Sequence, residues 1–521
     1  MSFSFRARRT APGRCLLALA AVLAVMPWQT ASAQNLQEFE KHVTEFTLPN
    51  GMHFIVVERH EAPVVSFETY VNVGSVDDPK GETGLAHMFE HMAFKGTRTI
   101  GSKNWAEEKK ALAAEDAAYQ ALDHERALGW RADKTKLAQL QKDFNAKQKA
   151  AEALVVPNEY PRLIEVNGGV GMNAETAEDD TQFFYSLPSN RAELWFYLES
   201  ERFLHPVFRE FYKERSVVAE ERRMRVDSNP EGKLIENLLG TAFEASPYKN
   251  SGVGWPSDLN GLTIEDAKAF FQKYYVPANF CEVIVGDVHP AQIRQWANEY
   301  FGRLPGRPAP LPNITHEPVQ DGPRTVKVLT PGPTQPIAAV AYHTPSEHSP
   351  DRAVFDVISS ILSSGRTSWF YRDLVEKEKV ALYAGGYPDF PGTKYPNLFV
   401  FLDVPAPGHS VAENLKAMQA EIDRLKTQPV DEATLRKVQT KARAGIIRSL
   451  DSNSGLAGQL AYYYTNFGDW RELFHQLQEI QAVTPADVQR VARTYFTDTN
   501  KTTAWLAQSA PKATTSAQEV H

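Results

Sequence analysis

Two histidines and a glutamate stand close together in a short apolar stretch of the chain. In the run from Gly84 to Met92, His87 and His91 are four residues apart and Glu90 precedes the second histidine. Residues four apart lie above one another on a helix, so both imidazoles can face one ion. Neutral imidazole is a preferred ligand of Zn²⁺, and Glu90 beside the same face can take a proton from a metal-activated water. The stretch predicts a zinc site with Glu90 as general base; the alternative, a capped and solvated helix, is disfavoured by the apolar neighbours.

A catalytic zinc needs a third protein ligand, and the best donors lie in the helical stretch 211–222. Glu214 and Glu221 are seven residues apart, which places them two turns apart on one face. Glu220 is rotated by about 100° from Glu221, so only one of the two can share the face of Glu214. The alternative is a surface helix whose acids pair with neighbouring arginines, and the pattern alone leaves both readings open. Those arginines are Arg215, Arg222, Arg223 and Arg225.

The composition is that of an ordinary folded protein of more than one domain. The chain has 521 residues, and 56 Lys and Arg against 64 Asp and Glu give a net charge of −8. That length exceeds what a single hydrophobic core usually supports. Without a basic excess or a clustered basic stripe, nucleic acid is excluded as the expected partner.

The first 33 residues have the pattern of a secretory signal peptide. Four arginines precede an apolar run from Cys15 to Trp28, and Ala31-Ser32-Ala33 supplies a small-residue cleavage site. The apolar run is too short to span a bilayer comfortably, so we expect no stable membrane anchor. The sequence therefore predicts a periplasmic or secreted protein after cleavage near Ala33.

Two related halves follow, which predicts an α+β protein with two homologous α/β sandwich-type halves. The pattern of residues 262–275 recurs at 483–496, and two helical stretches opening with Pro206 and Pro429 match as well. The period is roughly 220 residues. We expect a first domain over 34–305, a Pro-rich linker over 306–323, a second domain over 324–508 and a disordered tail over 509–521. A stretch rich in Ala, Leu, Lys and Glu at about 104–155 predicts a helical hairpin inserted in the first half.

Taken together, these motifs resemble the pitrilysin/insulin-degrading-enzyme family of inverted-zincin (HxxEH) metallopeptidases, which includes mitochondrial-processing-peptidase-like bacterial members. The resemblance rests on His87-x-x-Glu90-His91, the segment Asn167–Ala174 and the helix with Glu214 and Glu221. It covers essentially the whole chain after the signal segment.

The resemblance implies the processing-peptidase-like metallohydrolase fold and a set of site residues. His87, His91 and Glu221 would hold one Zn²⁺ per chain, because removing the insertion brings Glu221 to the family's spacing. Glu214 would support the site without binding metal. Asn173, on an edge strand where a substrate peptide adds as a further strand, would orient that peptide. The implied activity is zinc-dependent endopeptidase cleavage of peptides or unfolded polypeptides.

The second half lacks the zinc motif and departs from the family at the substrate-contacting residues. Where the duplication places the zinc helix, residues 351–361 offer neither His nor paired Glu. Active relatives use an Arg and a Tyr, seven apart, in this half. Tyr383 is the weak candidate for the Tyr, but Val375 stands where the Arg is expected and the spacing is one residue longer. We therefore expect a dimer, either of two copies of this chain or with a homologous partner that supplies the Arg/Tyr pair. The alternative function is a non-catalytic or partner-dependent peptide-binding subunit.

Overall fold

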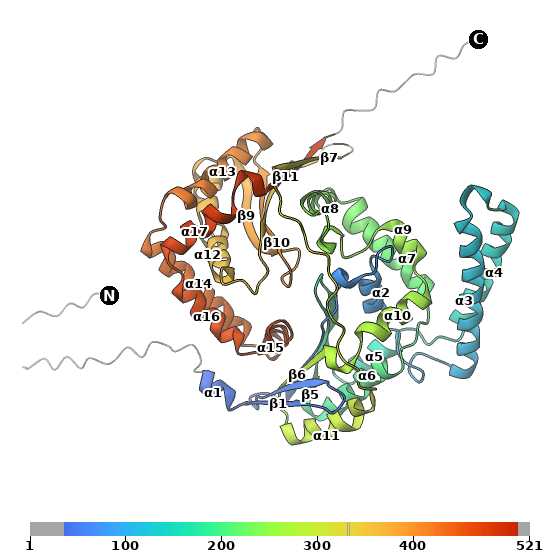
Figure 1. Ribbon diagram of the computed structural model, residues 1–521. Helices are drawn as coiled ribbons and strands as arrows, with labels where there is room; N and C mark the ends of the chain where they lie inside the picture. The colour runs from blue at the N-terminus through green and yellow to red at the C-terminus, as the bar shows by residue number, and fades with distance from the viewer. Residues whose placement is uncertain (1–35, 331, 333, 509–521) are drawn as a thin grey trace, which may run out of the picture.

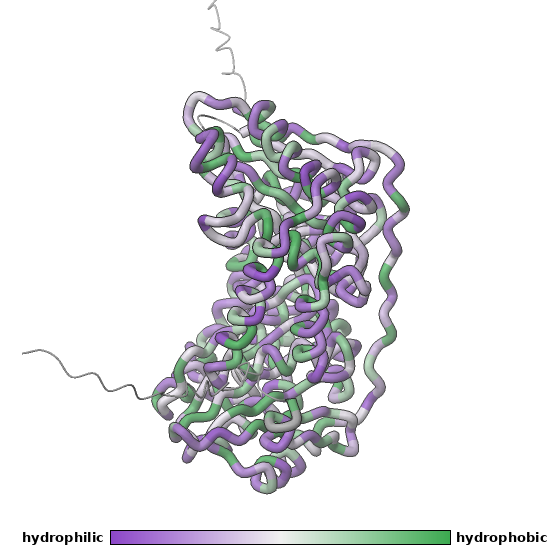
Figure 2. The backbone as a smooth tube through the Cα atoms, turned by 90° about the vertical axis from the view of Figure 1, so that its left-hand side faces the viewer, coloured by the Kyte–Doolittle hydropathy of each residue, from purple (hydrophilic) through white to green (hydrophobic). Residues whose placement is uncertain are grey.

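The computed structural model describes residues 36–508 except 331 and 333, and it shows two α/β lobes with a projecting helical hairpin (Figure 1). The predicted signal segment and the C-terminal tail lie outside the described residues. Figure 2 shows the two lobes end to end, with hydrophobic segments within each lobe. Within the described part, no helix is long and apolar enough to cross a membrane.

The first half is built on a six-stranded sheet in the order β1-β2-β6-β3-β5-β4. Strand β4 forms one edge of this sheet, and β2 and β6 run parallel as neighbours. The strands are β1 (Val43–Thr47), β2 (His53–Glu58), β3 (Val64–Val71), β4 (Val170–Thr176), β5 (Thr181–Pro188) and β6 (Phe280–Gly286). The helices are α1 (Leu36–Glu40), α2 (Leu85–Met92), α3 (Trp105–Ala127), α4 (Lys134–Glu152), α5 (Glu159–Val166), α6 (Ala192–Leu204), α7 (Phe211–Arg222), α8 (Pro230–Ala242), α9 (Pro256–Gly261), α10 (Ile264–Tyr274) and α11 (Pro290–Tyr300).

The second half repeats this plan with five strands in the order β7-β11-β8-β10-β9. The order matches β2-β6-β3-β5-β4, including one parallel pair beside three antiparallel ones, so β1 is the added strand of the first half. The strands are β7 (Arg324–Thr330), β8 (Ala338–Thr344), β9 (Ala381–Phe390), β10 (Asn397–Pro405) and β11 (Lys501–Gln508). The helices are α12 (Arg352–Ser363), α13 (Val411–Thr427), α14 (Glu432–Ser449), α15 (Asn453–Phe467), α16 (Glu472–Ala482) and α17 (Pro485–Tyr495).

The duplication is visible in single residues at the starts of two corresponding helices. Thr263 caps α10 and Thr484 caps α17, each in a capping box closed by an aspartate three residues later. In each box the threonine hydroxyl and the aspartate carboxylate satisfy backbone N–H groups that the helix leaves unpaired. The α+β class with two homologous halves, predicted from the sequence, is what the structure has.

Each half contributes one helix that packs against the sheet of the other half. Helix α8 of the first half packs Leu234 and Leu238 against the second sheet, in a core that includes Ala339 and Val400. Helix α15 of the second half packs Leu456 and Leu460 against the first sheet. The opposite face of each sheet is covered by helices of its own half. Each sheet therefore has one face buried by the other half of the chain.

The inserted hairpin consists of α3 and α4, which pack along each other away from the lobes (Figure 1). Its base is held by a buried ion pair: the Arg209 Nε donates to Glu108 Oε1 on α3 at 2.7 Å, and both side chains are almost fully buried. The same guanidinium donates to the carbonyls of Ile100 and Thr97 at 2.8 and 2.7 Å. This contact fixes the hairpin to the loop that follows α2.

Removing the carboxylate of this pair is expected to destabilise the protein strongly. Glu108→Ala leaves the Arg209 charge buried without its partner, which costs about 3–5 kcal/mol. Glu107→Ala on the exposed side of the same turn is the matched control, with a loss of less than about 1 kcal/mol. Equilibrium urea unfolding followed by tryptophan fluorescence measures both. Equal stability of the two variants would contradict this account of the hairpin base.

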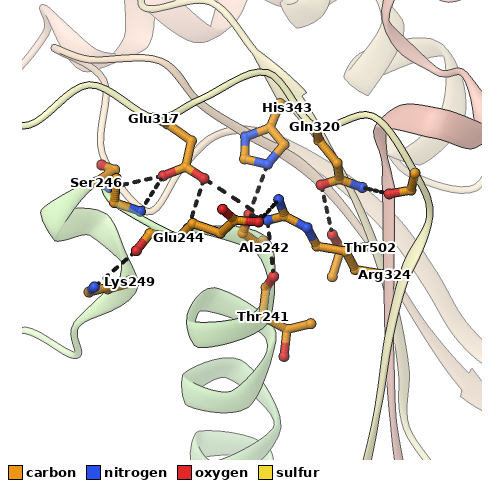
Figure 3. A network of polar contacts seen from close by, with 12 residues as sticks. Thr241, Ala242, Glu244, Ser246, Lys249, Glu317, Gln320, Arg324, His343 and Thr502 are labelled. Carbon is orange, nitrogen blue, oxygen red and sulfur yellow. Dashed lines mark hydrogen bonds and ion pairs between the residues drawn. The ribbon is translucent and has the colours of Figure 1, made fainter.

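The segment 306–322 contains neither helix nor strand, and its end is pinned to the turn after α8 (Figure 3). The Glu317 carboxylate accepts hydrogen bonds from the backbone N–H groups of Glu244, Ala245 and Ser246 at 2.7–2.9 Å. Gln320 donates to the Lys501 carbonyl at 3.0 Å, at the start of β11. The connection between the halves is thus fastened to both of them.

Candidate metal centre and active site

The start of helix α2 is fixed by a half-buried aspartate and a glycine. The Asp78 carboxylate accepts from the backbone N–H groups of Gly84 and Ala86 at 2.7 and 2.8 Å, which satisfies two unpaired donors of the first turn. Gly84 has φ +90°, and a Cβ there would lie 2.9 Å from the Val253 carbonyl oxygen. Only glycine fits that close approach. The apolar side of α2 is buried in the first core, so its His-bearing face is fixed in direction.

Three donor atoms from α2 and α7 converge on one point. His87 Nε2 lies 3.7 Å and His91 Nε2 lies 3.5 Å from the same oxygen, Oε2 of Glu221. All three ligand atoms lie within 4.8 Å of one another. Ligand atoms held about 2.1 Å from one tetrahedral ion lie about 3.4 Å apart. The set of two imidazoles and a carboxylate therefore fits Zn²⁺ in both chemistry and spacing.

The electrostatics of the histidines suit a metal ligand. Burial, together with the neighbouring His91 charge, lowers the pKa of His87 to about 4, so its imidazole is neutral at physiological pH. For His91 burial acts in the same direction, but the carboxylates of Glu214, Glu221 and Glu90 outweigh it and raise the pKa. A cation between these side chains would therefore meet the neutral imidazole of His87 and the negative charge of the neighbouring carboxylates.

Glu214 contacts His91 from the side opposite the convergence point. Its Oε2 lies 3.4 Å from His91 Nδ1, and its other oxygen pairs with Lys95. The charges of His91 and Lys95 outweigh burial and lower the pKa of Glu214, so it stays ionised as an acceptor. A carboxylate on the far nitrogen of a ligating histidine fixes the ring and the tautomer.

Glu214→Gln is expected to weaken zinc binding about 10–100-fold, because the ring of His91 loses its charged acceptor. Glu210→Gln is the matched control, since Glu210 shares the Lys95 ammonium at 3.2 Å without contacting a histidine. Competition with a chromogenic chelator measures both affinities. An unchanged affinity in Glu214→Gln would assign this residue a purely structural role.

Glu90 is half-buried on α2 and lies beside the convergence point. Burial raises its pKa, and the Thr176 hydroxyl at the end of β4 opposes this effect more weakly. A carboxylate with a raised pKa is a stronger base, and general bases work best when their pKa lies near the working pH. The arrangement can therefore accept a proton next to a bound cation.

The edge strand β4 lies beside α2 and carries Asn173 with its side chain exposed. Asn173 is opposite Phe184 of β5, and its other side faces no further strand of the sheet. An unpaired strand edge can receive an extended peptide. A cavity of about 240 Å³ opens next to Glu90 and His91, and its walls include Phe94 and Tyr160.

The two acids at the end of α7 point in different directions. Glu220 is exposed and pairs with Arg223, with Nε and Oε2 2.8 Å apart, and it takes no part in the cluster. Glu221 directs one oxygen at the histidines and the other at Arg225, whose Nη2 lies 2.7 Å away. Glu221 thus lies in the cluster with the two histidines and also pairs with an arginine. The contact of Arg225 with Glu221 is one that the surface-helix alternative names, whereas the contacts of Lys95 with Glu214 and of Thr176 with Glu90 were not predicted.

Two family models match parts of the chain that contain these features. The model described as "Insulinase (Peptidase family M16)" matches residues 54–138, which include the HxxEH motif. The model described as "Peptidase M16 inactive domain" matches residues 261–442. The chain belongs to peptidase family M16. The resemblance inferred from the motifs is thereby confirmed.

Relatives of this M16 chain are named as proteases. It is 27% identical to the zinc protease PqqE of Helicobacter pylori, over 94% of this chain and 98% of the relative. It is 20% identical to a probable β subunit of mitochondrial-processing peptidase from Arabidopsis thaliana, over 87% and 76% of the two chains. A crystal structure of a Helicobacter pylori protease matches with a TM-score of 0.74 and 27% identity, covering 89% of this chain and 99% of that one. The first half of the periplasmic protease PqqL of Escherichia coli shares the fold, with a TM-score of 0.65 at 16% identity, and coverage of 90% and 92%.

In this M16 chain, most of the match to the model named for an inactive domain falls on the half without an HxxEH motif. Val375 lies in the short π-helix Tyr371–Lys377 and packs against the second core. Tyr383 is 43% exposed on the edge strand β9, where its hydroxyl contacts that of Tyr387. The structure does not bring Tyr383 into hydrogen-bonding contact with the cluster of His87, His91 and Glu221.

Proposed function

We propose that this M16 protein is a zinc-dependent endopeptidase that cleaves peptides or unfolded polypeptides. The observation that carries the proposal is the convergence of His87, His91 and Glu221, from two helices far apart in sequence, with Glu90 alongside. The zinc-protease names of the relatives support the same class of activity.

His87, His91 and Glu221 would hold Zn²⁺, and Glu214 would keep the ring of His91 in place. When bound, Zn²⁺ supplies a Lewis acid that polarises a carbonyl and makes water a better nucleophile. Glu90 accepts the proton of the attacking water at its carboxylate and then donates it to the departing amine. Its half-buried position on α2 excludes much of the solvent that would compete for that proton.

The substrate would bind as an added strand on β4, which ends beside Glu90. Main-chain hydrogen bonds to the free edge hold an extended peptide irrespective of its sequence, and Asn173 orients it through its exposed amide. This mode requires an unfolded segment, because a folded domain does not offer a free strand. The signal-peptide pattern of residues 1–33 supports action in the periplasm or outside the cell.

The test is cleavage of an unstructured fluorogenic peptide together with metal analysis of the purified protein. We expect stoichiometric zinc, cleavage that stops when a chelator removes it, and recovery when zinc is returned. His87→Ala should contain no tightly bound zinc. A chain that binds zinc but cleaves no peptide alone or with a homologous subunit would contradict the proposal.

A second candidate is a subunit that cleaves only together with a homologous partner. It is favoured by Val375, which is partly buried against the second core at the position where active relatives are expected to carry an Arg. In this case the protein would form a heterodimer whose partner supplies the Arg/Tyr pair. Co-purification of the untagged protein from its source, followed by mass spectrometry, separates this candidate from a homodimer.

A further inference from the structure

A second group of side chains that could hold a metal ion lies at the end of two adjacent parallel strands. Strand β2 ends at Glu58 and its parallel neighbour β6 ends at Gly286, and these two residues are paired in register. Because parallel strands end at the same side of a sheet, the two following loops start next to each other. The Arg59 N–H extends the ladder by donating to the Gly286 carbonyl at 2.8 Å.

Both loops begin with an acid and a histidine two residues apart. The first gives Glu58-x-His60 and the second gives Asp287-x-His289. Glu58, His60 and His289 each offer a ligand atom within 4.8 Å of the other two. The His60 Nε2 lies 3.7 Å from Glu58 Oε2, and the rings of His60 and His289 are 5.5 Å apart.

The fourth residue, Asp287, positions the first histidine. Its Oδ1 lies 2.8 Å from His60 Nδ1, so this nitrogen carries the proton and Nε2 is left as the acceptor that faces Glu58. A carboxylate on the far nitrogen is the arrangement that metal-ligating histidines show in proteins.

The backbone of both loops is held in place by neighbouring elements. His289 is the N-cap residue of α11, and Pro290 follows it as the first helical residue, where a fixed φ is favourable. The Asp287 N–H donates to the Val64 carbonyl at 3.1 Å, at the start of β3. In the first loop, the Arg59 guanidinium donates to the carbonyls of Leu450 and Asp451 in the second half at 2.8 and 3.1 Å.

We propose that Glu58, His60 and His289 form a second binding site for a divalent transition-metal ion, with Asp287 as the positioning residue. Two imidazoles and one carboxylate suit Zn²⁺, whereas Mg²⁺ prefers oxygen ligands only. The site is separate from the α2–α7 centre and does not depend on the proposed function. Because its ligands are exposed or half-buried, we expect this site to bind the ion more weakly than the less exposed group of His87, His91 and Glu221 does.

Zinc titration of the untagged, chelator-treated protein by calorimetry tests this site. We expect two equivalents in the wild type, a tight one and a weaker one. His289→Ala and, independently, Glu58→Gln should each lose the weaker equivalent and retain peptide cleavage, whereas His87→Ala should lose only the tight one. Mg²⁺ should not bind to the weaker site. The His87 variant and the cleavage assay separate failure of this proposal from failure of the proposed function.

His475→Ala is the matched control. The His475 side chain is 49% exposed and lies 2.8 Å from Glu472 Oε1, while that of His60 is 50% exposed and lies 2.8 Å from Asp287. His475 belongs to no group of three donors among the described residues. The control should keep both equivalents. The proposal would be overturned if the wild type bound a single equivalent of zinc, or if both His289→Ala and Glu58→Gln still bound two.

Discussion

Glu90→Gln is expected to lose most of its peptide cleavage while it keeps its zinc. The amide has nearly the shape of the carboxylate but cannot accept the proton of the attacking water. General-base catalysis contributes about 10²–10⁴-fold to rate, so kcat/KM should fall by that factor. The three donor atoms that fit zinc belong to other residues, so the metal content should stay at the wild-type level. Steady-state kinetics and elemental analysis of the same preparation measure the two effects.

A nearby glutamate supplies the control for this variant. Glu82 also has a pKa raised mainly by burial, but it precedes α2 and is absent from the cluster. Glu82→Gln should cleave at close to the wild-type rate. An unchanged rate in Glu90→Gln would remove this residue from the mechanism, and loss of zinc in the same variant would make it a structural residue of the centre.

Glu221→Gln and Glu220→Gln should differ sharply, although the two residues are adjacent. Glu221 Oε2 lies within 3.7 Å of both histidine Nε2 atoms, whereas Glu220 is exposed and pairs with Arg223. An amide oxygen is a far weaker zinc ligand than a carboxylate, so Glu221→Gln should lose the tightly bound zinc and with it peptide cleavage. Glu220→Gln should keep both.

Two measurements compare these variants: the zinc content after dialysis against a weak chelator, and the rate of peptide cleavage. Circular dichroism should show that both variants are folded, because the contact of Glu221 with Arg225 is at the surface end of α7. The opposite outcome, zinc lost from Glu220→Gln and retained in Glu221→Gln, would show that the third ligand was assigned to the wrong residue.

The sequence predicted the parts of the site that depend on spacing along one helix. The His87, Glu90 and His91 pattern is local, and the structure places it on α2. Glu214 and Glu221 are likewise two turns apart on α7, as the helical period requires. Choosing Glu221 over Glu220 took the family resemblance, because a single helix does not reveal what its faces meet.

Contacts between distant segments could not be predicted from periodicity. The Gly-rich start of β4 has no alternation of apolar and polar residues, so only the resemblance marked it as a strand. No helix was assigned to α8 or α15 from the sequence, and the sheet that each one covers depends on contacts between the two halves. Glu58 and His289 are far apart in the chain and come together only because β2 and β6 are parallel neighbours.

The exchanged helix α8 has a mechanical consequence for the metal centre. It follows α7 after a single π-helical turn, Arg223–Asp227, so the helix that carries Glu221 continues almost directly into the other lobe. Because α8 packs on the second sheet, any movement of that sheet relative to the first would be passed through α8 to α7 and to the Glu221 carboxylate. In the proposed zinc enzyme, the affinity for the ion would therefore depend on the relative position of the two lobes.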